Sequence, residues 1–71
     1  MVGINENITP LTKRELQVLK LIAQGLSTKE ISSSLGITFN TVETYRKRIQ
    51  KKLNVRNCTE AVYHMTKLNI L

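Results

Sequence analysis

Cysteine, histidine, proline and phenylalanine each occur once in the 71-residue chain, and tryptophan is absent. A single cysteine excludes an internal disulfide, and one cysteine with one histidine cannot supply the ligands of a zinc site. No uninterrupted apolar run exceeds three residues, so no pattern of a membrane span or signal peptide is present. We therefore expect a soluble, cytoplasmic protein with no metal, no cofactor and no membrane partner.

Acidic residues are also few, with five Asp and Glu against eleven Lys and Arg, which gives a net charge of +6. A domain this basic is typical of proteins that meet a polyanion, either nucleic acid or an acidic membrane surface. Apolar residues make up 41% of the chain and are mostly Leu, Ile and Val, which suffices for a compact helical core. The length allows one small domain but no deep substrate cavity beside that core.

Four helix-start signals follow one another along the chain, and no strand-like alternation competes with them. In two of them a hydroxyl residue precedes a glutamate by three positions, so the pair can form a capping box. We predict an all-α, four-helix bundle over residues 11–71, preceded by a flexible leader at residues 1–10. The expected caps are Thr12, Ser27, Thr38 and Asn57, and the expected helices span about residues 13–24, 28–35, 39–53 and 58–68.

Basic residues concentrate in the third predicted helix, because five of the eleven fall between Arg46 and Lys52. At about 100° per residue, Val42, Ile49 and Leu53 share one face of that helix. The helix can therefore pack one side on the core and offer the other side to a polyanion. Phe39 and Tyr45 flank the apolar face, and the opposite face carries Asn40, Thr44, Lys47 and Lys51, with Glu43 and Arg48 at its edges.

A short helix, a three-residue turn at residues 36–38 and a longer basic helix form the pattern of a helix-turn-helix. Gly36 can adopt the positive φ that such a turn requires, because glycine has no Cβ. Ser32 supplies a small side chain where the two helices cross. The inner positions that hold the two helices together are expected to be Ile31, Leu35, Ile37 and Val42.

Four stretches of the chain resemble the LuxR/GerE/FixJ-type DNA-binding domain. They are LTKRELQVLKLIAQG (residues 11–25), LSTKEISSSLGIT (26–38), TVETYRKRIQKKL (41–53) and NCTEAV (57–62). The resemblance covers residues 11–68 and implies a four-helix bundle of bacterial transcription regulators, with helix 39–53 as the recognition helix. In that family the domain is mostly the C-terminal part of response regulators or quorum-sensing receptors. The resemblance therefore implies an N-terminal receiver or sensor domain if this sequence is a fragment.

The resemblance also assigns roles to individual residues. It implies that Glu43, Thr44 and Lys47 face base edges, and that Lys29 and Thr41 contact phosphates near the starts of their helices. The 100° spacing along the helix agrees for Thr44 and Lys47, which are central on the polar face. The remaining expected contacts with the DNA backbone are Asn40, Arg48 and Lys51.

Glu43 and Tyr45 depart from the family pattern, which usually has Lys and His at these positions. A glutamate can accept a hydrogen bond from the amino group of cytosine, so Glu43 indicates an altered base preference. The alternative is that Glu43 forms an ion pair with Lys47, four residues further along the helix surface. The sequence leaves both readings open.

The last predicted helix has two apolar sides. Ala61, Met65 and Leu68 share the face that we expect to complete the core. Cys58, Val62 and Thr66 form its edge, where the resemblance implies that two copies of the domain meet. Alternatively, these three residues are half-exposed packing residues of a monomer, and Cys58 packs as a small apolar side chain.

We predict a sequence-specific, non-catalytic domain that binds double-stranded DNA as a homodimer, with helix 39–53 in the major groove. No enzyme activity is expected, because the serines at residues 32–34 have no histidine or acid placed to activate a nucleophile. Two alternatives remain: a basic protein-interaction module that docks an acidic partner, and a promoter-binding module like region four of a sigma factor.

Overall fold

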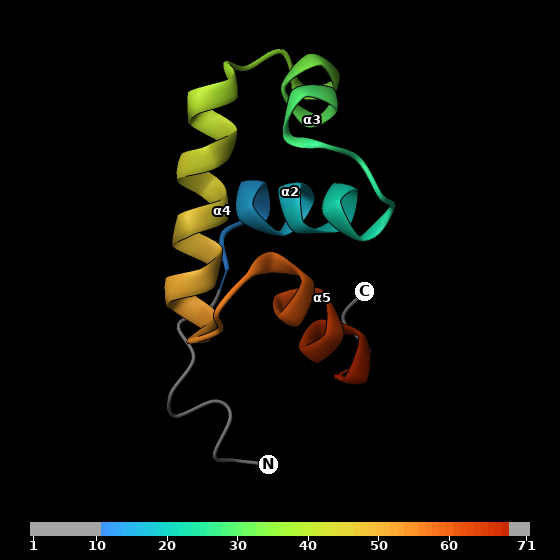
Figure 1. Cartoon of the computed structure of the whole chain (residues 1–71), viewed down its shortest axis with the longest axis vertical. Coiled ribbons are helices and arrows are strands. Elements are labelled where there is room, and N and C mark those ends of the chain that lie inside the picture. The colour runs from blue at the N-terminus through green and yellow to red at the C-terminus, as the bar shows by residue number, and fades with distance from the viewer. Residues whose placement is uncertain (1–10, 69–71) are drawn as a thin grey trace.

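Four helices make up residues 11–68, the part of the chain that this computed structural model describes (Figure 1). They are α2 (Lys13–Ala23), α3 (Thr28–Leu35), α4 (Phe39–Leu53) and α5 (Cys58–Lys67). The predicted all-α class is confirmed. Each helix boundary agrees with its prediction to within one residue, since Gln24 and Leu68 are C-caps rather than the last helical residues. The predicted flexible leader at residues 1–10 lies outside the described residues.

Side chains close to the helix starts satisfy the backbone groups there. The Thr12 hydroxyl accepts from the backbone N–H of Glu15 at 3.1 Å, and the backbone N–H of Thr12 donates to Glu15 Oε1 at 2.9 Å. Ser27 and Glu30 form the same reciprocal pair at 3.1 and 2.8 Å. Each cap stabilises its helix by about 1 kcal/mol. Thr38 and Asn57 cap α4 and α5, as the sequence predicted.

Left-handed residues end the two helices of the helix-turn-helix. Gly36 ends α3 with a φ of 68°, and Asn54 ends α4 with a φ of 54°. Glycine and asparagine are the residues that adopt this conformation most readily. The turn is fixed further because the Ile37 N–H donates to the Ser32 carbonyl at 3.0 Å. The chain therefore turns sharply from α3 into α4 within three residues (Figure 1).

α4 forms one side of the molecule and contacts the other three helices, while α2 lies between α3 and α5 (Figure 1). Each helix contributes fully or almost fully buried side chains to one apolar cluster, which fixes the face that α4 turns inward. The buried members of this cluster are Val18, Leu19, Ile31, Val42, Ile49, Leu53, Ala61 and Met65.

Leu68, which was expected to complete the core, is exposed, and so is Phe39, which was expected to flank the apolar face of its helix. Phe39 is 52% exposed and Leu68 is 41% exposed. Phe39 is the first residue of α4 and Leu68 is the C-cap of α5, so each lies at a helix end. The prediction for Leu68 was wrong because helical periodicity gives a direction around the helix axis but not the extent of the neighbouring helices. Tyr45 is partly buried against the core, as predicted.

Candidate nucleic-acid interface

The face of α4 that points away from the core is polar and exposed. Val42, Ile49 and Leu53 are buried on the opposite face, which fixes the rotation of the helix about its axis. The outward face is thus presented to solvent by the same packing that forms the core. Its exposed members are Asn40, Thr44, Lys47 and Lys51, with Arg48 beside them.

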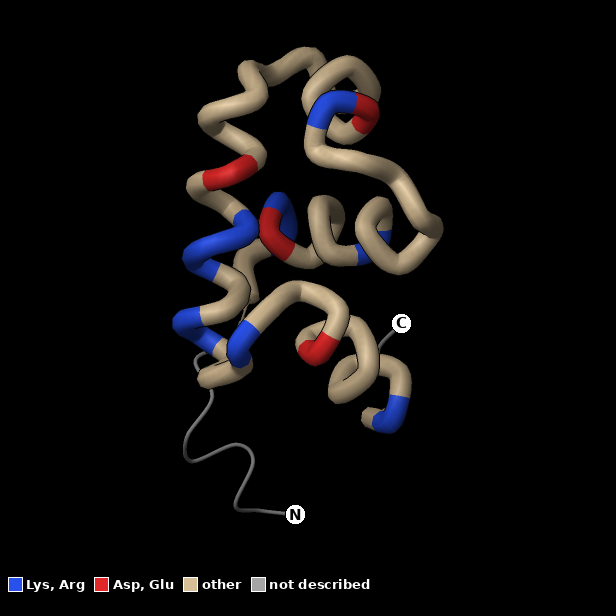
Figure 2. The backbone as a smooth tube through the Cα atoms, viewed as in Figure 1, with Lys and Arg blue, Asp and Glu red and all other residues tan. Residues whose placement is uncertain are grey.

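Positive charge gathers on the C-terminal half of α4. Figure 2 shows Lys and Arg along this half of the helix, whereas Glu43 lies nearer the N-terminal end. Among residues 11–68, Lys47, Arg48 and Lys51 make no ion pair. Arg48 lies over the ring of Tyr45, with its guanidinium carbon 6.0 Å from the ring centroid. These cations are therefore available to an external polyanion.

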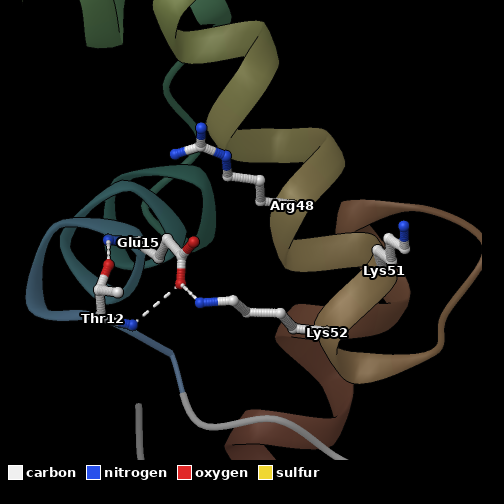
Figure 3. Close-up of a pocket in the computed structure, with 5 residues that line it drawn as sticks. All are labelled: Thr12, Glu15, Arg48, Lys51 and Lys52. Atoms are coloured by element: carbon white, nitrogen blue, oxygen red, sulfur yellow. Dashed lines mark hydrogen bonds and ion pairs between the residues drawn. The ribbon is translucent and has the colours of Figure 1, made fainter.

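One further cation of α4, the partly buried Lys52, is paired within the protein. Its Nζ lies 2.7 Å from Glu15 Oε1, in a pocket between the start of α2 and the C-terminal half of α4. In Figure 3, Lys52 points toward Glu15, whereas Lys51 points away from it. The pair joins residues 37 positions apart, so no local pattern could have revealed it. The residues that line this pocket are Thr12, Glu15, Arg48, Lys51 and Lys52.

Glu15 is 2% exposed, yet it is stabilised in its ionised form. Burial by itself raises the pKa of Glu15, because a charged carboxylate loses its hydration. The hydrogen bonds from Lys52 and from the backbone N–H of Thr12 outweigh that effect and lower the pKa below its ordinary value. Glu15 therefore carries a charge at neutral pH and ties the first turn of α2 to α4.

Glu43 is turned toward α3. Its Oε2 accepts a hydrogen bond from the hydroxyl of Thr28 at 2.7 Å, and Arg46 Nε lies 3.9 Å from the same oxygen. Thr28 is the first residue of α3, so Glu43 links the start of that helix to α4. The predicted ion pair with Lys47 is wrong, because within the described range the ion pair of Glu43 is with Arg46.

Hydroxyl groups near the start of α4 are engaged locally. The Thr44 hydroxyl donates to the carbonyl of Asn40 at 3.0 Å, which leaves its oxygen free to accept. The hydroxyls of Thr41 and Thr38 lie 2.8 Å apart, within the cap of the helix. Lys29 is exposed and follows Thr28, whose contact with Glu43 places the start of α3 beside α4. The structure thus brings the first turn of α3, which includes Lys29, close to the N-terminal half of α4.

The three residues predicted at a dimer interface have different surroundings. Cys58 is 2% exposed, and its sulfur lies 3.7 Å from Gln50 Nε2 and 3.8 Å from the carbonyl oxygen of Arg46. It packs between α5 and α4, so its side chain is not on the surface where a partner would bind. Val62 is partly buried against the core, and Thr66 is exposed. These two residues remain available at the surface of α5.

No group of three or more His, Cys, Asp or Glu side chains within residues 11–68 is placed to hold a metal ion. None of the four described helices combines the length and the apolar character needed to cross a bilayer. The geometry instead centres on one exposed, cationic helix face and on the turn that orients it.

A short helix, a tight turn at Gly36 and a basic helix with an exposed polar face define a helix-turn-helix DNA-binding domain. Residues 9–69 match the family model described as "Bacterial regulatory proteins, luxR family". The chain belongs to this family. It is a DNA-binding domain of transcription regulators rather than an enzyme, which confirms the resemblance found in the sequence and decides against a sigma-factor region.

Curated relatives agree with the family match. The chain is 50% identical over 52 residues to the transcriptional regulatory protein MctR of Rhizobium johnstonii, covering 73% of this chain and 24% of the relative. It is 45% identical over 56 residues to UhpA of Salmonella typhimurium, covering 79% of this chain and 29% of the relative. It is 44% identical over 62 residues to DesR of Bacillus subtilis, covering 87% and 31%. The chain thus spans a third or less of the length of these relatives.

Two solved structures share the fold. The response regulator ChrA of a heme-sensing two-component system has a TM-score of 0.82 at 32% identity, over 89% of this chain and 31% of that one. SdiA, solved in complex with octanoyl-rac-glycerol, has a TM-score of 0.79 at 33% identity, over 84% of this chain and 25% of that one. Both confirm the all-α, four-helix architecture.

Proposed function

We propose that this domain binds a specific double-stranded DNA sequence as a homodimer, with α4 in the major groove of each half-site. The observation that supports this most directly is the exposed face of α4, where Lys47, Arg48 and Lys51 make no ion pair within the described chain. Unpaired cations on a helix of the right width for the major groove are the arrangement that a helix-turn-helix uses.

Within that face, Thr44 and Lys47 are the proposed base contacts. Both are exposed on the outward side of α4, Thr44 with a free acceptor oxygen and Lys47 with three donors. A lysine can donate to the O6 and N7 acceptors of guanine. A base contact by Glu43 would break its hydrogen bond to Thr28, so we assign Glu43 a positioning role between α3 and α4.

Phosphate contacts orient the domain without reading the sequence. Arg48 and Lys51 are exposed on the C-terminal half of α4, and Lys29 is exposed near the start of α3. Cations on two helices would thus contact the backbone on either side of the groove. Asn40 and Thr41 complete the proposed contacts near the N-terminal end of α4.

A single module of this size buries little surface, so useful specificity favours two copies on two half-sites about one helical turn apart. We propose that α5 supplies the contact between the copies through Val62 and Thr66. Because the chain spans a third or less of its curated relatives, we further propose that the whole protein carries an N-terminal receiver or sensor domain. It would act in the bacterial cytoplasm, where the chromosome lies.

Selection of bound duplexes from a random DNA pool tests the proposed function. We expect enrichment of one sequence with two related half-sites, and an affinity for it that falls steeply with salt concentration. The same protein should bind random duplexes about 10³-fold or more weakly than the selected duplex. Equal affinity for selected and random duplexes would contradict sequence-specific binding, and preferential binding to an acidic polypeptide would support the protein-interaction alternative.

A further inference from the structure

The only phenylalanine of the chain is exposed to solvent at the start of α4. Phe39 is 52% exposed, whereas Tyr45, the other aromatic residue of the same helix, packs against the core. The two other large apolar residues that are exposed within residues 11–68 are Tyr63 and Leu68, at or beyond α5. Phe39 is therefore the one large apolar side chain that the described fold presents on the helix-turn-helix.

Phe39 lies at the N-terminal end of the helix that carries the residues proposed to read bases. Residues four apart lie on nearly the same side of a helix, so Phe39 lies one turn before Glu43, at the border between the buried and the outward face of α4. Each Cα–Cβ bond tilts toward the helix N-terminus, which directs the Phe39 ring toward the N-terminal end of α4. In Figure 1 this end of α4 extends beyond α2 and α5 and is flanked only by α3 and its turn. A groove that receives α4 would also receive this ring.

The chemistry of the ring limits what it can recognise there. A phenyl group has no hydrogen-bond donor or acceptor, so it cannot read the polar edge of a base. The apolar feature of the major groove is the C5-methyl group of thymine, and phenylalanine is among the side chains that contact it. In recognition helices of this class, the N-terminal residues are those that reach base edges.

We propose that Phe39 contacts the C5-methyl group of a thymine and so makes each half-site selective for a T·A pair where the N-terminal end of α4 enters the groove. The inference rests on the proposed function, since it requires α4 to enter the major groove. It adds a specificity-determining residue to the face formed by Thr44 and Lys47.

Deoxyuridine tests this contact, because it differs from thymidine only by the absence of that methyl group. Each thymine of the duplex selected by the 71-residue chain is replaced in turn, and the affinity is measured for the parent and for Phe39→Ala. For the parent we expect a loss of about four-fold at one thymine of each half-site, which is about 0.8 kcal/mol for one buried methyl group at about 1.4 kcal/mol per factor of ten. Phe39→Ala should bind the thymidine duplex more weakly and lose nothing further at that position.

Tyr63→Ala is the matched control, since Tyr63 is a similarly exposed aromatic residue on α5. It should keep the parent's response to deoxyuridine, and circular dichroism should show unchanged helicity in both variants. A parent that keeps its sequence preference but ignores every deoxyuridine replacement would overturn the proposal for Phe39 and leave the proposed function intact. A four-fold loss that persists in Phe39→Ala would also overturn it. A chain with no sequence preference at all would overturn both.

Discussion

The two halves of α4 differ in charge and in how the fold holds them. Residues 46–53 carry Arg46, Lys47, Arg48, Lys51 and Lys52, whereas residues 39–45 carry only the negative charge of Glu43. The C-terminal half is tied to α2 through the pair of Lys52 with Glu15, and the N-terminal half is tied to α3 through the bond of Glu43 with Thr28.

This difference suggests a division of labour along one helix. Arg48 and Lys51, the proposed phosphate contacts, attract DNA of any sequence, so the C-terminal half beyond Lys47 is suited to affinity. The N-terminal half has little charge and exposes Phe39 and Thr44, which carry an apolar group and a hydroxyl. Groups of this kind discriminate between bases. The ion pair and the hydrogen bond would each keep one half in position for its task.

Loss of the ion pair between Glu15 and Lys52, which anchors the C-terminal half of α4, is expected to have the largest effect on stability. Glu15→Gln removes a buried negative charge and leaves Lys52 without its partner, while the amide can still accept at the start of α2. We expect the free energy of unfolding to fall by about 2–3 kcal/mol, somewhat less than for a fully buried pair because Lys52 is 24% exposed. Urea unfolding followed by circular dichroism measures this change.

Glu60→Gln is the control for that substitution. It makes the same chemical change in the exposed pair with Arg56, whose side chain is 89% exposed. The expected loss is below about 1 kcal/mol. If both variants lost the same free energy of unfolding, the pair with Lys52 would not be an anchor.

Val62→Glu tests whether two copies of the domain must contact each other through α5 to bind a duplex with two half-sites. An unpaired carboxylate in the proposed contact should lower the affinity for a duplex with two half-sites about ten-fold, which is about 1.4 kcal/mol. Binding to a single half-site should be unchanged, as measured by gel shift with one-site and two-site duplexes. His64→Glu adds the same charge on the other flank of α5 and should leave both affinities near the parent's. Loss of cooperative binding in the control alone would contradict the role of Val62.

Glu43→Lys changes the charge of the N-terminal half. It replaces a repelled carboxylate with a cation, so we expect tighter binding to random DNA and a salt slope that is larger by about one unit. The preferred sequence should stay the same, because Thr44 and Lys47 supply the proposed base contacts. Sequence selection with the variant checks this, and an altered preference at one base pair would restore Glu43 as a base-reading residue. Glu43→Gln keeps an acceptor for Thr28 and should have a salt slope between those of the parent and Glu43→Lys.

Lowering the pH should weaken the ion pair between Glu15 and Lys52 gradually, and by less than Glu15→Gln does. The folded-state pKa of Glu15 is lower than that of an ordinary glutamate, so its stabilising effect is fully present above the unfolded-state pKa. The effect is lost as the pH falls below 4.5, the ordinary value, and through the folded-state pKa. Unfolding free energies measured between pH 7 and pH 3 should show a steeper loss for the parent than for Glu15→Gln. Parallel curves would contradict the lowered pKa.

The helix boundaries could be predicted because the signals that set them are local. Thr12 and Ser27 contact groups three residues away, and Gly36 acts through its own backbone conformation. The outward face of α4 was predictable for the same reason, since helical periodicity fixes which residues oppose Val42 and Ile49.

Contacts between helices could not be predicted from local patterns. Glu15 with Lys52 joins residues 37 apart, and Thr28 with Glu43 joins residues 15 apart. Both depend on the angles at which the helices cross. Cys58 was expected at the edge of the last helix, but the packing of α5 on α4 buries it. The contacts that hold the two halves of α4 in place are thus the part of the site that required the structure.

The most direct test of the division along α4 compares Lys51→Ala with Thr44→Ala, using the selected duplex and a random duplex over a range of salt concentrations. For Lys51→Ala we expect an equal loss of affinity for both duplexes and a salt slope lower by about one unit. For Thr44→Ala we expect the slope to stay the same and the preference for the selected duplex to fall by about 1–3 kcal/mol. If each variant changed slope and preference together, the two halves of α4 would not have separate roles.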